Sequence, residues 1–104
     1  MRIYGLKACD TCRKAAKALP AADFVDVREA PLEAGQVARF LGEFGEALVN
    51  RRSTTWRGLS EAEREKPPEV LLAAHPTLMK RPVIEADGAL HLGWGKDVQA
   101  SLGV

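Results

Sequence analysis

The chain opens with a short apolar segment that leads directly into an amphipathic stretch carrying two cysteines at its start. Residues 1–5 are typical of a β-strand, and residues 10–19 of a helix that Pro20 stops, with Cys9 and Cys12 at the junction. A helix N-terminus offers unpaired N–H groups and the positive end of the helix dipole, which favour a thiolate over a thiol. Because thiolates attack disulfides and oxyanions, the junction predicts a nucleophilic or redox site.

The two cysteines are expected to differ in role. Cys9, at the helix start, is the predicted nucleophile, and Cys12, one turn in, is the predicted resolving thiol. A zinc site is disfavoured, because there is no third cysteine and His75 and His91 lack zinc-ligand spacing. Two other interpretations stay open: buried small apolar side chains, or a structural disulfide that would close a very short loop and constrain little.

Composition narrows the classes of partner. The 104 residues suit one domain, and 15 basic against 14 acidic side chains give a net charge of +1, which favours neither nucleic acid nor a membrane surface. No leader-like segment or apolar run of membrane length is visible, so we expect a cytoplasmic protein. In that compartment the cysteines are expected to take part in a reaction and not to form a structural disulfide. Nothing in the sequence indicates a large exposed apolar surface, and we expect a monomer.

The order of predicted elements indicates the fold class. After the first strand and helix come a strand at 23–27, a helix at 31–44, a short helix that a capping box at Ser60 begins, and a helix at 69–74 after a Pro-Pro pair. A strand pair at 82–86 and 89–92 around an Asp87-Gly88 turn and a last helix at 96–102 follow. A strand–helix–strand unit favours a parallel pair, and the hairpin adds antiparallel strands. We therefore predict an α/β, thioredoxin-like fold, a mixed four-stranded sheet with helices on both faces.

Four blocks of the sequence form a recognisable series: residues 4–15 around the cysteines, 50–57, 78–84 and 93–95. Together they resemble the arsenate reductase-like (ArsC) family, which includes Spx-type regulators and small YffB-type proteins, and the second block is closest to the YffB-type form. The resemblance implies a single ArsC-like domain over 1–104. In it, a thioredoxin-like core of about 1–32 and 78–104 carries a helical insertion of about 33–77.

The resemblance also implies a set of site residues. Arginines of the central motif and of the Arg-Pro motif would bind an anion, which here means Arg81 and one of Arg51 and Arg52; which of the two faces the site stays open. The Arg81–Pro82 bond would be cis and lie against Cys9, although Pro82 could also merely begin an edge strand.

Lys7 stands two residues before Cys9, close enough to raise the local positive potential. A planar guanidinium suits an oxyanion or a carboxylate, and a nearby cation also lowers a thiol pKa, so both kinds of positive charge fit a thiolate site.

Three positions depart from the pattern of the family's dedicated arsenate reductases. Gly5 stands where they carry a histidine, and Gly93 to Lys96 contains no arginine where they carry a third one. Cys12 stands where many YffB-type members have an apolar residue. The first two departures weigh against arsenate itself, and the third favours dithiol cycling.

The resulting hypothesis is a thiol-dependent reductase whose Cys9 thiolate attacks a disulfide, a glutathione adduct or an oxyanion such as arsenate. Glutathione is the expected co-substrate, with glutaredoxin or thioredoxin as other possible reductants, and no bound cofactor or metal is expected. Two alternatives are an Spx-type redox-sensing regulator that binds RNA polymerase and an inactive thioredoxin-like domain.

Overall fold

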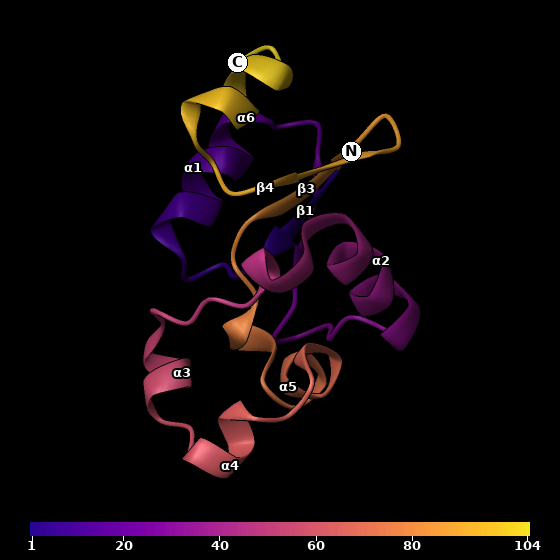
Figure 1. The fold of residues 1–104 in the computed structure, drawn as a ribbon. Coiled ribbons are helices and arrows are strands. Elements are labelled where there is room, and N and C mark those ends of the chain that lie inside the picture. The colour runs from indigo at the N-terminus through magenta and orange to yellow at the C-terminus, as the bar shows by residue number, and fades with distance from the viewer. The chain divides into compact units, whose positions relative to one another are not determined.

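The computed structural model describes residues 1–104 and divides the chain into two compact units (Figure 1). One unit, here called the sheet unit, joins Met1–Ala30 to Arg81–Val104. The other, the helical unit, is the continuous segment Pro31–Lys80. No helix in the chain is long and apolar enough to cross a membrane.

The sheet unit contains the mixed four-stranded sheet that the element order predicts. Its strands are β1 (Arg2–Gly5), β2 (Asp23–Asp26), β3 (Val83–Ala86) and β4 (Ala89–Leu92), in the order β2-β1-β3-β4. β1 pairs in parallel with β2 and antiparallel with β3, and β3 and β4 form an antiparallel hairpin. Asp87 and Gly88 join the hairpin with φ values of 51° and 80°, the left-handed pair that a tight Asp-Gly turn uses.

Helices α1 (Asp10–Ala18) and α6 (Lys96–Ser101) pack on the same face of this sheet, and Figure 1 shows them side by side. Ile3 and Ile84 are register partners, so the alternation of side chains along both strands points them to one face. Ala15 of α1, Leu19 directly after α1 and Val98 of α6 cover them and complete a buried cluster. This apolar contact fixes the start of α1 relative to the end of β1.

The helical unit is built from short helices around a separate set of buried side chains. Its elements are α2 (Ala34–Phe44), a 3₁₀ turn (Gly45–Leu48), α3 (Thr54–Arg57), α4 (Glu61–Arg64), α5 (Pro68–Ala74) and a second 3₁₀ turn (Pro76–Leu78). α2 packs against α5, and Phe40 and Leu78 are fully buried. A bridge between Val49 and Met79 joins the residue that follows the first 3₁₀ turn to the residue that follows the second.

Two details of the helical unit differ from the sequence prediction. α2 begins at Ala34 rather than Pro31, because the chain is still extended at Glu33 (φ −72°, ψ 158°). Helix α3 was not predicted; the Oγ of Ser53 accepts a hydrogen bond of 3.1 Å from the Trp56 N–H and caps it. The predicted cap at Ser60 is confirmed, since its Oγ accepts from the Glu63 N–H at 3.2 Å.

Candidate active site

Cys9 occupies the N-cap of α1. β1 ends at Gly5, and the short loop that follows turns back, with the Cys9 N–H donating to the Leu6 carbonyl at 3.0 Å. Cys9 itself is extended (φ −86°, ψ 122°), while its carbonyl already accepts from the Arg13 N–H at 3.0 Å. Its sulfur therefore lies where a serine or aspartate oxygen would normally cap the helix, next to unpaired N–H groups.

The surroundings of Cys9 favour the thiolate. Partial burial raises the pKa of the Cys9 thiol, but hydrogen bonds from the backbone N–H and thiol of Cys12 and from Arg81, with the Arg81 charge, outweigh it. The net result is a Cys9 pKa below the ordinary value.

Cys12 is held in the opposite state. Its side chain is fully buried, and this burial raises the pKa of its thiol to about 11, with further increases from the hydrogen bond and charge of Cys9. At neutral pH Cys12 is therefore a thiol that can donate to the Cys9 sulfur. Both cysteines are free in the structure.

Arg81 and Pro82 lie on the cysteine side of the sheet unit, as the resemblance implies. The Arg81–Pro82 peptide bond is cis, the isomer expected from the sequence, and Pro82 is buried directly before β3. Arg81 is half-buried and its guanidinium interacts with both sulfurs, lowering the pKa of Cys9 by hydrogen bond and charge. Cys9, Cys12 and Arg81 thus form one cluster within the sheet unit.

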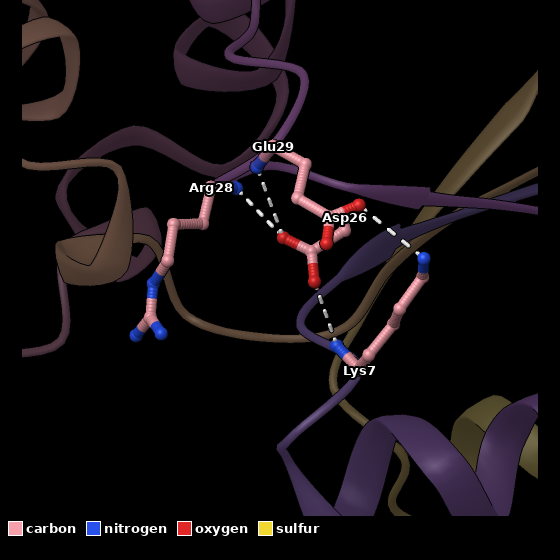
Figure 2. Close-up of polar contacts among 4 residues, drawn as sticks. All are labelled: Lys7, Asp26, Arg28 and Glu29. Carbon is pink, nitrogen blue, oxygen red and sulfur yellow. Dashed lines mark hydrogen bonds and ion pairs between the residues drawn. The ribbon is translucent and has the colours of Figure 1, made fainter.

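The side chain of Lys7, expected to raise the positive potential near Cys9, pairs with an acidic side chain in the structure. Its ammonium lies 3.3 Å from a carboxylate oxygen of Glu29, in a pair whose side chains are both 67% exposed. Its backbone N–H instead donates to Asp26 at 3.0 Å, and Asp26 also accepts from the backbone N–H groups of Arg28 and Glu29 (Figure 2). The carboxylate at the end of β2 therefore anchors the loop that carries Cys9.

Sequence reasoning missed both Asp26 and a second anchor of this loop. Arg13 donates to the Ala8 carbonyl at 3.2 Å and pairs with Asp10 at 3.2 Å. The signal for Asp26 was present, because an aspartate that ends a strand before a turn commonly accepts from backbone N–H groups two and three residues on. The Lys7 contact, 19 residues away in sequence, had no local signal.

Arg51 and Arg52 belong to the helical unit, where they line a cavity of about 580 Å³ with Lys80, Asn50 and Glu46. Arg51 pairs with Glu46 at 3.5 Å, and the Arg52 N–H donates to the Asn50 side chain at 3.0 Å. Three cations against one carboxylate make this cavity positive. Lys80 was not among the predicted ligands, although it directly precedes Arg81 in the sequence.

Trp56 contacts two arginines, one of which, Arg51, lines this cavity. Its indole is half-buried and has the Arg51 guanidinium 5.4 Å and the Arg64 guanidinium 5.5 Å from the ring centroid. Arg64 also donates to the Trp56 carbonyl, with Nε at 3.3 Å and Nη2 at 3.2 Å. These contacts hold the backbone and the Arg51 side chain in place. No three His, Cys, Asp or Glu side chains of the chain lie together as metal ligands would.

The mixed sheet and the cysteine at the β1–α1 junction define a thioredoxin-like protein. The family model described as "ArsC family" matches residues 4–101, and the chain belongs to that family. The resemblance proposed from the sequence and the predicted fold class are both confirmed.

Three relatives illustrate the match. An uncharacterized protein of Haemophilus influenzae is 38% identical over 109 residues, covering 95% of this chain and 96% of that protein. The solved structure of a protein named YFFB is 33% identical with a TM-score of 0.87, covering 96% of each chain. An arsenate reductase (ArsC) related protein from Brucella melitensis is 35% identical with a TM-score of 0.73, covering 99% of this chain and 94% of that one.

Replacing Arg81 tests its effect on the thiol. In a Cys12→Ser background, Arg81→Gln should move the pH midpoint of Cys9 alkylation upward, because a hydrogen bond and a positive charge beside the thiolate are both lost. Arg81→Lys should give a smaller upward shift, since it keeps the charge but loses the planar fork. Arg28→Gln is the matched control, and an unchanged midpoint in Arg81→Gln would remove Arg81 from this role.

Replacing Asp26 tests the loop anchor. Hydrogen bonds from three backbone N–H groups, the one from Lys7 foremost, lower the Asp26 pKa below its ordinary value of 3.8 despite some opposing burial. The stabilisation is therefore fully present above that value and is lost as pH falls through the folded-state pKa.

Asp26→Asn should lower the free energy of unfolding near neutral pH by on the order of 1 kcal/mol, since one oxygen acceptor becomes a donor. The difference from wild type should shrink in acid. Urea denaturation at several pH values measures it, and Glu29→Gln, which breaks only the exposed pair with Lys7, should cost less than about 0.5 kcal/mol. A difference that is constant with pH would contradict the anchoring role of the carboxylate.

Proposed function

We propose that the protein is a thiol-dependent reductase whose preferred substrates are glutathione mixed disulfides. The observation that carries the proposal is the cluster of Cys9, Cys12 and Arg81, in which one sulfur is stabilised as a thiolate and the second is kept protonated beside it. Membership of the ArsC family supports the broader class of reductase. A pair of thiols in such contrasting states suits exchange between sulfurs better than a single anion-binding step.

The reaction proceeds by two exchanges. The Cys9 thiolate attacks the glutathione sulfur of a mixed disulfide, the substrate sulfur leaves as a thiolate that takes up a proton, and Cys9 is left bonded to glutathione. The second exchange has two routes. Cys12 can attack the Cys9 sulfur, which releases glutathione as a thiol and forms a Cys9–Cys12 disulfide that two further glutathione molecules then reduce. Alternatively, free glutathione attacks the sulfur of the bound glutathione, which forms glutathione disulfide and releases Cys9 as a thiolate. In both routes the substrate is reduced and glutathione supplies the electron pair.

Positive side chains recognise the acidic parts of the substrate in this proposal. Arg81 stabilises the thiolate and can pair with a carboxylate. Within the helical unit, the cavity lined by Arg51, Arg52 and Lys80 is a candidate site for a carboxylate. Lys7 contributes through the loop rather than through its charge, because Glu29 already pairs with its ammonium. A cycle that consumes glutathione requires a reducing compartment, so we place the protein in the cytoplasm.

Arsenate remains a second substrate to test, because a guanidinium beside a thiolate also suits an oxyanion. The sheet unit supplies one arginine to the sulfur cluster, and Gly93–Lys96 adds none. Glutathione-dependent formation of arsenite, measured beside disulfide reduction, ranks the two substrates. We expect disulfide reduction to have the higher kcat/KM.

Activity of single-residue variants tests the proposal. With the mixed disulfide of glutathione and 2-mercaptoethanol, Cys9→Ser should abolish reduction, whereas Arg51→Gln/Arg52→Gln should raise the KM for the mixed disulfide about ten-fold with a smaller change in kcat. Arg28→Gln, an exposed arginine of the sheet unit, should leave both constants unchanged. Full activity in Cys9→Ser would refute the reductase, and an unchanged KM in the double variant would remove the cavity from the site.

A further inference from the structure

Gly5, the last residue of β1, leaves the space that the Cys12 side chain fills. A Cβ added at Gly5 would lie 2.5 Å from Cys12 Sγ, 3.2 Å from Cys12 Cβ and 3.7 Å from Phe24 Cζ. Real Cβ atoms do not approach a sulfur to 2.5 Å, so any other residue at position 5 must displace Cys12 or the strand.

The glycine is not needed for backbone reasons. Gly5 is absent from the glycines with positive φ, which are Gly45, Gly88, Gly93 and Gly103. It is paired in an ordinary parallel ladder, opposite Asp26 of β2. The absence of a side chain is therefore the property that matters at this position, and the contact it permits is the one with Cys12.

The Cys12 side chain has little room to move away from a Cβ at position 5. It is fully buried and has a single rotatable bond to the sulfur, and helical backbone restricts the staggered positions available to it. Rotating the sulfur away would still leave the 3.2 Å approach to Cys12 Cβ, which is itself tight. A side chain at position 5 would therefore move the thiol away from the place where it meets Cys9.

The electrostatics of the pair show why that place matters. Burial raises the Cys12 pKa most, and the hydrogen bond and charge of Cys9 raise it further, whereas a backbone hydrogen bond at Leu6 and the Arg81 charge lower it. Once Cys9 is bonded to glutathione, its thiolate charge is gone and only burial still opposes ionisation, while Arg81 continues to favour it. The Cys12 thiol becomes more acidic after Cys9 has reacted, which is when a resolving thiolate is needed.

We propose that Gly5 is a positioning residue that seats the Cys12 thiol against Cys9, so that Cys12 rather than a second glutathione resolves the mixed disulfide. The inference rests on the proposed reductase function. In this step the bond between Cys9 Sγ and Cys12 Sγ forms as the bond between Cys9 Sγ and the glutathione sulfur breaks. Cys12 is oxidised, the departing glutathione sulfur is reduced, and the Cys12 proton ends on glutathione.

Treatment of the reduced protein with glutathione disulfide, followed by acid quenching and mass spectrometry, measures the step directly. Wild type should pass through the Cys9 adduct to the internal disulfide. Gly5→Ala should accumulate the adduct and form the internal disulfide at least about ten-fold more slowly, because a displaced nucleophile loses its alignment. Gly42→Ala, at a glycine with open space around it, is the matched control and should match wild type.

A double variant separates positioning from loss of folding. Cys12→Ala and Gly5→Ala/Cys12→Ala should both stop at the Cys9 adduct and form it at equal rates, because removal of the sulfur removes the closest contact. If Gly5→Ala lowers the urea midpoint, the added Cys12→Ala change should restore most of that loss.

The outcomes distinguish this inference from the proposed function. An internal disulfide that forms at the wild-type rate in Gly5→Ala, or a wild type that stops at the adduct, overturns the role of Gly5 but leaves the reductase standing. A wild type whose Cys9 takes up no glutathione refutes the reductase. In that case diamide, which oxidises two neighbouring thiols to a disulfide without glutathione, still tests the role of Gly5. The rate at which the Cys9–Cys12 disulfide forms is then compared between wild type and Gly5→Ala.

Discussion

The interaction on which the site depends is the stabilisation of one sulfur at the start of a helix. Cys9 takes the position of the capping residue of α1, and the Cys12 N–H of the first turn and the guanidinium of Arg81 both stabilise its thiolate. The second sulfur, at Cys12, is buried and stays protonated. A thiolate and a thiol side by side provide a nucleophile together with the group that can later displace its product.

The sheet unit supplies the rigidity that this arrangement needs. Ile3 and Ile84 are paired across β1 and β3, and α1 packs over them, so the helix start cannot move without disturbing a buried cluster. The Cys9 loop between β1 and α1 has its own anchor, because Asp26 accepts the backbone N–H of Lys7 (Figure 2). The reactive sulfur is therefore positioned by elements whose own stability does not depend on any charged contact at the thiol.

Much of the sheet unit could be predicted because its signals are local. The junction of strand, cysteine and helix, and the Asp87-Gly88 turn, each lie within a few residues, and the resemblance supplied the Arg81–Pro82 pair. The contact of Asp26 with Lys7 joins segments far apart in sequence and carried no such signal. The contact of Gly5 with Cys12 had none either, because Gly5 stood out in the sequence only as the position where the family's arsenate reductases carry a histidine. The extra helix α3 was missed because its cap, Ser53, lies in a polar motif that resembled a binding loop. The direction of the Lys7 ammonium toward Glu29 likewise depends on tertiary packing.

The most direct test of this account is a pH titration of both cysteines in the reduced wild-type protein, monitored by the NMR chemical shifts of ¹³Cβ-labelled cysteine. We expect the pKa of Cys9 to lie below the ordinary thiol value, and the pKa of Cys12 to be raised to about 11 while Cys9 is a thiolate. Two cysteines that titrate together near the ordinary value would contradict the assignment of nucleophile and resolving thiol.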